Sequence, residues 1–176
     1  MMAIVVQHCD LRTLALGRPG MSPAKGASLA EAAAVCLDSQ GHSSGLILRV
    51  IRKDDVDCVL TWNASDDQQR QTYADIAEAT EEGACAIALC AVEAIAGLVV
   101  MERSRKRSAF DYWLGDKPGH LFQRTVRLEV SGILQGDATM IEKRLTEKLQ
   151  RLERYRSRLP AIVAVVEFGT PQVRLE

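Results

Sequence analysis

Two acidic residues in neighbouring strand-like runs are the residues of this chain whose types and spacing could do chemistry. Asp111 stands in AFDYWLG, and Glu129 follows 18 residues later in RLEVSG. Two carboxylates on adjacent strands, on one face of a sheet, could converge on a hard cation such as Mg²⁺, which takes carboxylate oxygens and keeps several waters. Such an ion activates water and neutralises charge on phosphoryl oxygens. The pair therefore suggests a metal site for phosphodiester hydrolysis.

Each of these acids also has a purely structural explanation. Asp111 could accept hydrogen bonds from the backbone near a strand end, and Glu129 could pair with Arg127 or Arg124 across the sheet surface. Glu93 raises the same question, because it is the only charge in the apolar run CAIALCAVEAIAGLVV. It is either a functional acid or an exposed helix glutamate.

The second half of the chain contains the elements that must position these acids. The hydrophobic period changes from helical to strand-like at Gly97 and back at Asp137. We expect one sheet with helices packed against it, with strands over 98–103, 109–114, 123–134 and 161–168 and helices over 74–97 and 137–158. Side chains alternate along the third strand, so Glu129 and Ser131 should point to the face opposite Val130.

The first half predicts an extension of that sheet. After about 25 irregular residues, a helix is expected from Ser28, a good N-cap, to about Gly41. GLILRVI and VDCVLTW flank a polar turn and predict a β-hairpin over 42–63, which should extend the sheet or form a homodimer contact. The chain is therefore expected to be an α/β protein with a mixed central sheet flanked by helices. It divides into a helix-plus-hairpin extension over 1–65 and a core over 66–176, with PQVRLE as an edge strand.

The order helix, strand with Asp, strand with Glu-x-x, helix, strand resembles the core of the PD-(D/E)XK nuclease superfamily, which includes restriction enzymes and Holliday-junction resolvases. The resemblance covers residues 73–168 and implies a restriction-endonuclease-like core. It would make Asp111 and Glu129 the metal-binding acids, with Glu93 as a third acid from the preceding helix. It further implies Mg²⁺ or Mn²⁺ as cofactor and nucleic acid as substrate; DNA is the expected form, and RNA remains open.

Ser131 departs from the family pattern. The family has a lysine there, which stabilises developing charge or helps to orient the nucleophile. A serine brings no positive charge, so catalysis would need Lys143, Arg124 or Arg127 to reach the site. Ser131 is therefore a candidate catalytic position, and two functions remain open. One is a metal-dependent nuclease. The other is a catalytically degenerate nuclease fold that binds nucleic acid or a partner protein within a larger assembly. An α/β protein of unrelated function is a third interpretation.

The charge is distributed unevenly along the chain. Residues 1–97 contain 7 Lys+Arg against 13 Asp+Glu, a net −6, whereas residues 98–176 contain 15 against 10, a net +5. A basic half indicates a polyanionic partner. The candidate phosphate contacts are Arg103, Arg105, Lys106, Arg107 and Lys143. The alternative is a solvated surface laced with ion pairs.

Several other classes of protein are disfavoured. The start of the chain has no secretory pattern, and the longest apolar stretch is interrupted by Glu93 and is short for a membrane span. The five cysteines lack the paired short spacings of a zinc site, and no P-loop or dinucleotide fingerprint is present. We expect a cytoplasmic protein with reduced cysteines and no membrane contact.

Overall fold

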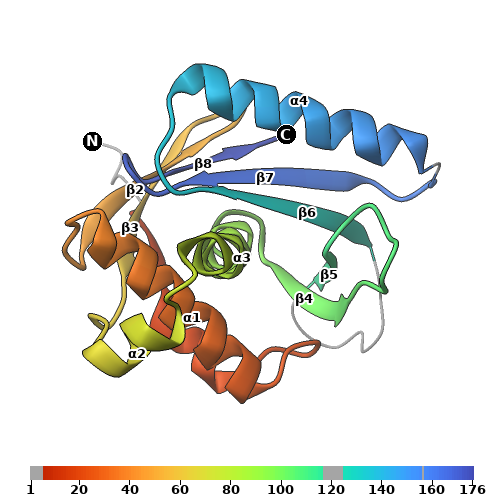
Figure 1. Ribbon diagram of the computed structural model, residues 1–176. Helices are drawn as coiled ribbons and strands as arrows, with labels where there is room; N and C mark the ends of the chain where they lie inside the picture. Colours follow the sequence, from red (N-terminus) through yellow and green to blue (C-terminus); the bar gives the residue numbers. More distant parts are fainter. Residues whose placement is uncertain (1–5, 117–124, 156) are drawn as a thin grey trace, which may run out of the picture.

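The predicted α/β layer is built on one mixed sheet of eight strands with helices on both faces (Figure 1). The computed structural model describes residues 6–116, 125–155 and 157–176. Across the sheet the strands are β1 (Gln7–Asp10), β3 (Val56–Thr61), β2 (Leu46–Ile51), β8 (Gln172–Leu175), β7 (Ala161–Glu167), β6 (Val126–Ile133), β5 (Tyr112–Asp116) and β4 (Leu98–Arg103).

The four strands predicted in the second half do lie in one sheet. β4, β5 and β6 form an antiparallel meander, and β7 returns parallel to β6. β7 is almost wholly buried, as its apolar sequence predicts. The prediction of an edge strand at the C-terminus is wrong, because β8 lies between β7 and β2 inside the sheet.

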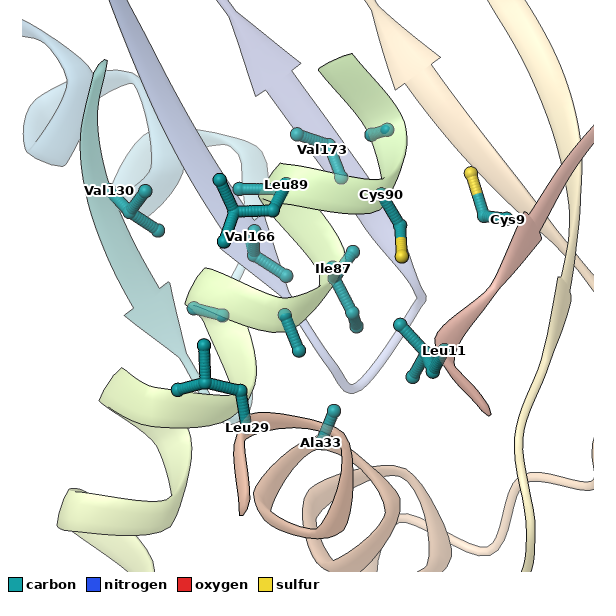
Figure 2. Packing of buried hydrophobic residues seen from close by; sticks show 14 of the residues in the cluster. Cys9, Leu11, Leu29, Ala33, Ile87, Leu89, Cys90, Val130, Val166 and Val173 are labelled. Carbon is teal, nitrogen blue, oxygen red and sulfur yellow. The ribbon is translucent and has the colours of Figure 1, made fainter. Parts of the chain in front are cut away.

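Helices cover the two faces of the sheet differently. α4 (Ala138–Arg154) lies alone on one face, where Ile141, Leu145 and Leu152 are buried. α3 (Ile76–Ala96) lies on the other face, and α1 (Pro23–Ser39) packs against its outer side (Figures 1 and 2). Because α3 is covered by the sheet on one side and by α1 on the other, it is apolar on nearly all sides. No helix in the described part of the chain has the length and apolar character that crossing a membrane requires.

The N-terminal part differs from the expectation in its boundaries. Helix α1 begins at Pro23 rather than near Ser28, because Ser22 accepts a hydrogen bond from the Lys25 backbone as N-cap and proline suits the first helical position. The irregular start contains β1 and a 3₁₀ helix, η1 (Leu11–Leu16). A short helix, α2 (Asp67–Thr72), is separate from α3. The predicted hairpin is confirmed as β2–β3, and it extends the sheet by pairing β2 with β8.

A close approach between α3 and β6 fixes the distance between the helix and the sheet. A Cβ placed on Gly132 of β6 would lie 2.4 Å from the backbone oxygen of Thr80 in α3. Only glycine allows the two backbones to approach this closely. The N-terminal half of α3 is therefore held against the C-terminal end of β6, which extends beyond its pairing with β5.

Candidate active site

Asp111 and Glu129 meet where β5 begins beside β6. The backbone N–H of Asp111 donates to the carbonyl of Leu128 at 2.8 Å, and Asp111 Oδ2 accepts a hydrogen bond from the Val130 N–H at 2.9 Å. The Asp111 side chain thus takes the place of a neighbouring strand at this point. The structural role considered for Asp111, accepting from backbone at a strand end, is present, and it holds the carboxylate beside β6.

Both acids line one cleft of about 380 Å³. The cleft runs around the start of β5, where β6 extends beyond its pairing with β5. It reaches from the first half of α3 on one face of the sheet to the middle of α4 on the other. Its charged wall from α4 consists of Arg144, Lys148 and Arg151, and its wall from α3 includes Glu81, Glu82 and Cys85. A site with carboxylates at the base and basic side chains on one wall can accommodate a phosphate group together with a cation.

Lys148 is the direct partner of Glu129. Its Nζ lies 2.5 Å from Glu129 Oε1, and the two side chains are only 22% and 5% exposed. Four residues earlier on α4, Arg144 Nη1 donates to Ser131 Oγ at 2.8 Å. Four residues of helix rise about 6 Å and two residues of strand about 6.6 Å. The spacing of Arg144 and Lys148 on α4 therefore matches the spacing of Ser131 and Glu129 on β6.

Burial and like charge raise the affinity of Glu129 for a proton. Removal from water raises its pKa to about 7, and the nearby negative charge of Asp111 acts in the same direction, against the stabilising ammonium of Lys148. On the other acid, Arg103 Nη1 lies 3.3 Å from Asp111 Oδ1, and its guanidinium lies 4.6 Å from the centre of the Tyr112 ring. The two carboxylates are thus close together and surrounded by cations.

Glu93 does not line this cleft. It forms an ion pair with Arg18 at 2.7 Å near the other end of α3. The acids that α3 does bring to the cleft are Glu81 and Glu82. Glu82 pairs with Lys25 at 2.7 Å. Glu82 and Glu93 are 11 residues apart, about 16 Å along a helix, so the predicted third acid lies toward the opposite end of α3 from the cleft.

Of the predicted basic phosphate contacts, one lines the cleft and the others do not. Arg103 lines the cleft. Arg105, Lys106 and Arg107 are exposed on the β4–β5 connection, where Arg107 has a positive φ of 73°. Lys143 is exposed on α4 and is not part of the cleft wall.

Two further basic residues were considered as partners for the acids. The Arg127 guanidinium donates to the Leu159 carbonyl at 2.9 Å rather than to Glu129. Arg124 lies outside the described residues.

The donor set at the cleft suits a hard cation with few protein ligands. Among residues 6–116, 125–155 and 157–176, no group of three or more His, Cys, Asp or Glu side chains is placed to hold a metal. Mg²⁺ commonly takes only one or two carboxylates and keeps its remaining waters. Asp111 and Glu129 supply such a pair, so they fit Mg²⁺ or Mn²⁺.

Comparisons with models of protein families, with curated proteins and with solved structures give no match to this chain. The geometry of the cleft is therefore the basis for assigning a function.

Proposed function

We propose that the chain is a divalent-metal-dependent nuclease of the PD-(D/E)XK type that acts on DNA. The observation that carries the proposal is the shared cleft in which the carboxylates of Asp111 and Glu129 lie together with the ammonium of Lys148. The order α3, β4, β5, β6, α4, β7 agrees with the order that the family resemblance implies. Asp111 and Glu129 are the proposed ligands of Mg²⁺ or Mn²⁺.

In this proposal Lys148 replaces the lysine that the family has at the position of Ser131. The family residue is two positions after the glutamate on the same strand, whereas Lys148 comes from α4 and contacts that glutamate directly. Arg144 adds a second cation through its bond to Ser131. The charge that Ser131 lacks is thus supplied by the helix that lies across the same face of β6.

The roles of the residues follow from their places in the cleft. When bound, the metal ion supplies an activated water and neutralises charge on the phosphoryl oxygens. Lys148 is placed to orient the nucleophile and stabilise negative charge beside Glu129. Arg144 and Arg151 line the same cleft, and in this proposal they hold non-bridging phosphate oxygens. Glu129 binds a cation best when deprotonated, so its raised pKa makes metal binding stronger above about pH 7.

Cleavage of DNA by matched variants tests the proposal. Supercoiled plasmid and labelled oligonucleotides are incubated with wild type, Asp111→Asn, Lys148→Met and Lys143→Met, with Mg²⁺, with Mn²⁺ or with chelator. Wild type and Lys143→Met are expected to cleave with metal and not with chelator. Asp111→Asn and Lys148→Met are expected to lose about a hundredfold in rate or more. Cleavage by Asp111→Asn at the wild-type rate would overturn the proposal.

A second candidate is a non-catalytic subunit that keeps the nuclease fold for binding. The observation that favours it is that both carboxylates already have protein partners, Glu129 with Lys148 and Asp111 with Arg103. In that case the ion pairs serve to hold α4 and the β4–β5 connection on the sheet. Calorimetric titration separates the candidates, because the binding subunit takes up neither Mg²⁺ nor Mn²⁺ and Asp111→Asn changes only its stability.

A further inference from the structure

A second cavity lies beside the cleft on the same face of β6. It is open and has a volume of about 630 Å³, within the range of small-molecule sites. Its residues are Arg127, Leu149, Leu152, Glu153, Tyr155, Ser157, Arg158 and Ala161. Arg127 precedes Glu129 by two residues on β6, so their Cα atoms are separated by about 6.6 Å along the strand. Any ligand in this cavity is therefore next to the proposed site of cleavage.

Arg127 is a buried cation with an unmet hydrogen-bonding need. Its side chain is part of the cavity wall, yet the residue is only 7% exposed. Nη2 donates to the Leu159 carbonyl, and the guanidinium lies 6.0 Å from the centre of the Phe110 ring. Within the described residues, Arg127 Nε is the buried side-chain nitrogen or oxygen that has no partner, and Arg127 belongs to no ion pair there. Nη1 lies 3.5 Å from the Tyr155 carbonyl. Nε itself is closed to the cavity, so it is the positive charge of the guanidinium, without a carboxylate partner among the described residues of the cavity wall, that favours an electronegative ligand atom there.

The remaining wall favours a flat, apolar ligand that continues into a phosphate chain. Leu149 and Leu152 provide apolar surface, and Tyr155, which is 49% exposed, lines the cavity directly after the C-terminal end of α4. Arg151, on the same helix, lines the neighbouring cleft. An aromatic ring on which a base can stack, beside cations that follow a backbone, is the general means of holding single-stranded nucleic acid.

We propose that this cavity binds one unpaired base of a DNA strand whose adjacent phosphate lies in the Asp111–Glu129 cleft. The inference rests on the proposed function and gives it a substrate class, DNA with a single-stranded stretch at the cleavage point. The base stacks on Tyr155 and fills the space over Leu149, and one of its ring nitrogens or carbonyl oxygens accepts from Arg127. A base within an intact duplex is paired and stacked, so it would first have to leave the helix to enter.

Binding without metal separates this inference from catalysis. Fluorescence anisotropy with chelator present compares a labelled single-stranded thymidine oligonucleotide with a blunt duplex of equal length. The variants are Tyr155→Ala, which removes the ring, and Leu149→Trp, which fills the cavity. Met140→Ala, an exposed residue near the start of α4 and outside the cavity, is the control. Circular dichroism confirms that each variant is folded.

Wild type and Met140→Ala are expected to bind the single strand more tightly than the duplex. Tyr155→Ala and Leu149→Trp should each weaken single-strand binding about tenfold and leave duplex binding unchanged. Wild-type affinity for the single strand in both variants, or equal weakening for both DNA forms, overturns the base site while metal-dependent cleavage stands. The opposite combination is also informative: single-strand binding is selectively weakened in both variants, but Asp111→Asn cleaves like wild type. That result retains the base site and rejects the proposed catalytic acids. Absence of binding to either DNA overturns the base site, and the cleavage assay with metal then decides the proposed function by itself.

Discussion

Lys148 and Ser131 reach the same small region of the cleft from two elements, α4 and β6. If the site needs one ammonium beside Glu129, its origin should matter less than its presence. We therefore predict that Lys148→Met lowers the metal-dependent cleavage rate about a hundredfold or more, and that adding Ser131→Lys to that variant restores part of it. Initial rates of plasmid nicking measure both effects.

The rescue has a direct control that keeps Lys148. Ser131→Lys in the wild-type background adds a third cation beside Arg144 and Lys148, so it should not raise the rate further. The contrary result is a double variant with Lys148→Met and Ser131→Lys that folds and yet cleaves no faster than Lys148→Met alone. That result would show that the ammonium of Lys148 has a positional role that a lysine on β6 cannot fill.

The pKa of Glu129 predicts a dependence of stability on pH. Burial and the charge of Asp111 raise this pKa from 4.5 to about 7, so the folded state holds a proton that the unfolded state has released. The free energy of unfolding of wild type should therefore fall as pH rises from about 4.5 to about 7, with about 1.4 kcal/mol corresponding to each pKa unit. Glu129→Gln cannot titrate and should lack this contribution.

Urea denaturation of wild type and Glu129→Gln at several pH values checks the prediction. The variant should gain stability relative to wild type across the interval and show a constant difference above about pH 8. Parallel curves from pH 4.5 to pH 7 would show that Glu129 titrates in the folded protein as it does in the unfolded chain.

Residues on adjacent strands could be predicted from sequence, whereas their partners on helices could not. Asp111 and Glu129 come together through the pairing of β5 with β6. Alternation correctly placed Glu129 and Ser131 on one face, where both contact α4. Lys148 is one of many basic residues on α4, and only the packing of that helix on β6 decides which turn faces Glu129. The same holds for Glu82, since nothing local distinguishes it from other acids of α3.

At the scale of elements, the distance between α3 and β6 depends on Gly132. A methyl group there would meet a backbone oxygen of α3 at 2.4 Å, and neither backbone can move without disturbing the cleft. Gly132→Ala should lower the free energy of unfolding by about 1–3 kcal/mol or more, as measured by urea denaturation. Gly136→Ala is the comparison, because the atom nearest to its added Cβ is a side-chain methyl of Ile133 at 2.8 Å rather than a backbone atom, so it should cost less than Gly132→Ala. Equal effects of the two variants would contradict this account.

The types of most elements followed from local pattern, but their boundaries and neighbours did not. The change to a strand period at Gly97 and the return to a helical period at Asp137 were sufficient for the confirmed sheet and its helices. The Ser28 start was wrong because the sequence contains a second capping signal, at Ser22 and Pro23. The interior position of β8 depends on pairing with β2, about 120 residues away in the chain, a contact that no local pattern contains.

At the scale of the whole molecule, the predicted extension over 1–65 and the predicted core form the same two layers. The extension contributes strands to the one sheet and α1 to the helical layer that contains α3. β2 pairs with β8, and α1 packs so closely on α3 that a Cβ on Gly83 would lie 2.8 Å from the Ala33 backbone. A homodimer contact on the hairpin remains a prediction, for which the exposed Ile47 of β2 is the natural position to test. Sedimentation of wild type and Ile47→Asp measures it, and a dimer that persists in the variant would place the contact elsewhere.

The shared layers predict that residues 66–176 do not fold alone. Removing 1–65 would leave α3 with an uncovered apolar side and β8 with an unpaired edge, both of which favour aggregation. We expect the full chain to unfold in one calorimetric transition and the 66–176 fragment to show no cooperative transition. Co-expression with a separate 1–65 chain should restore a soluble complex with the wild-type transition, because that chain supplies β2 and α1. A soluble, monomeric fragment with its own cooperative transition would instead establish 66–176 as an independent domain, with the cleft complete except for Lys25 and Leu29 from α1.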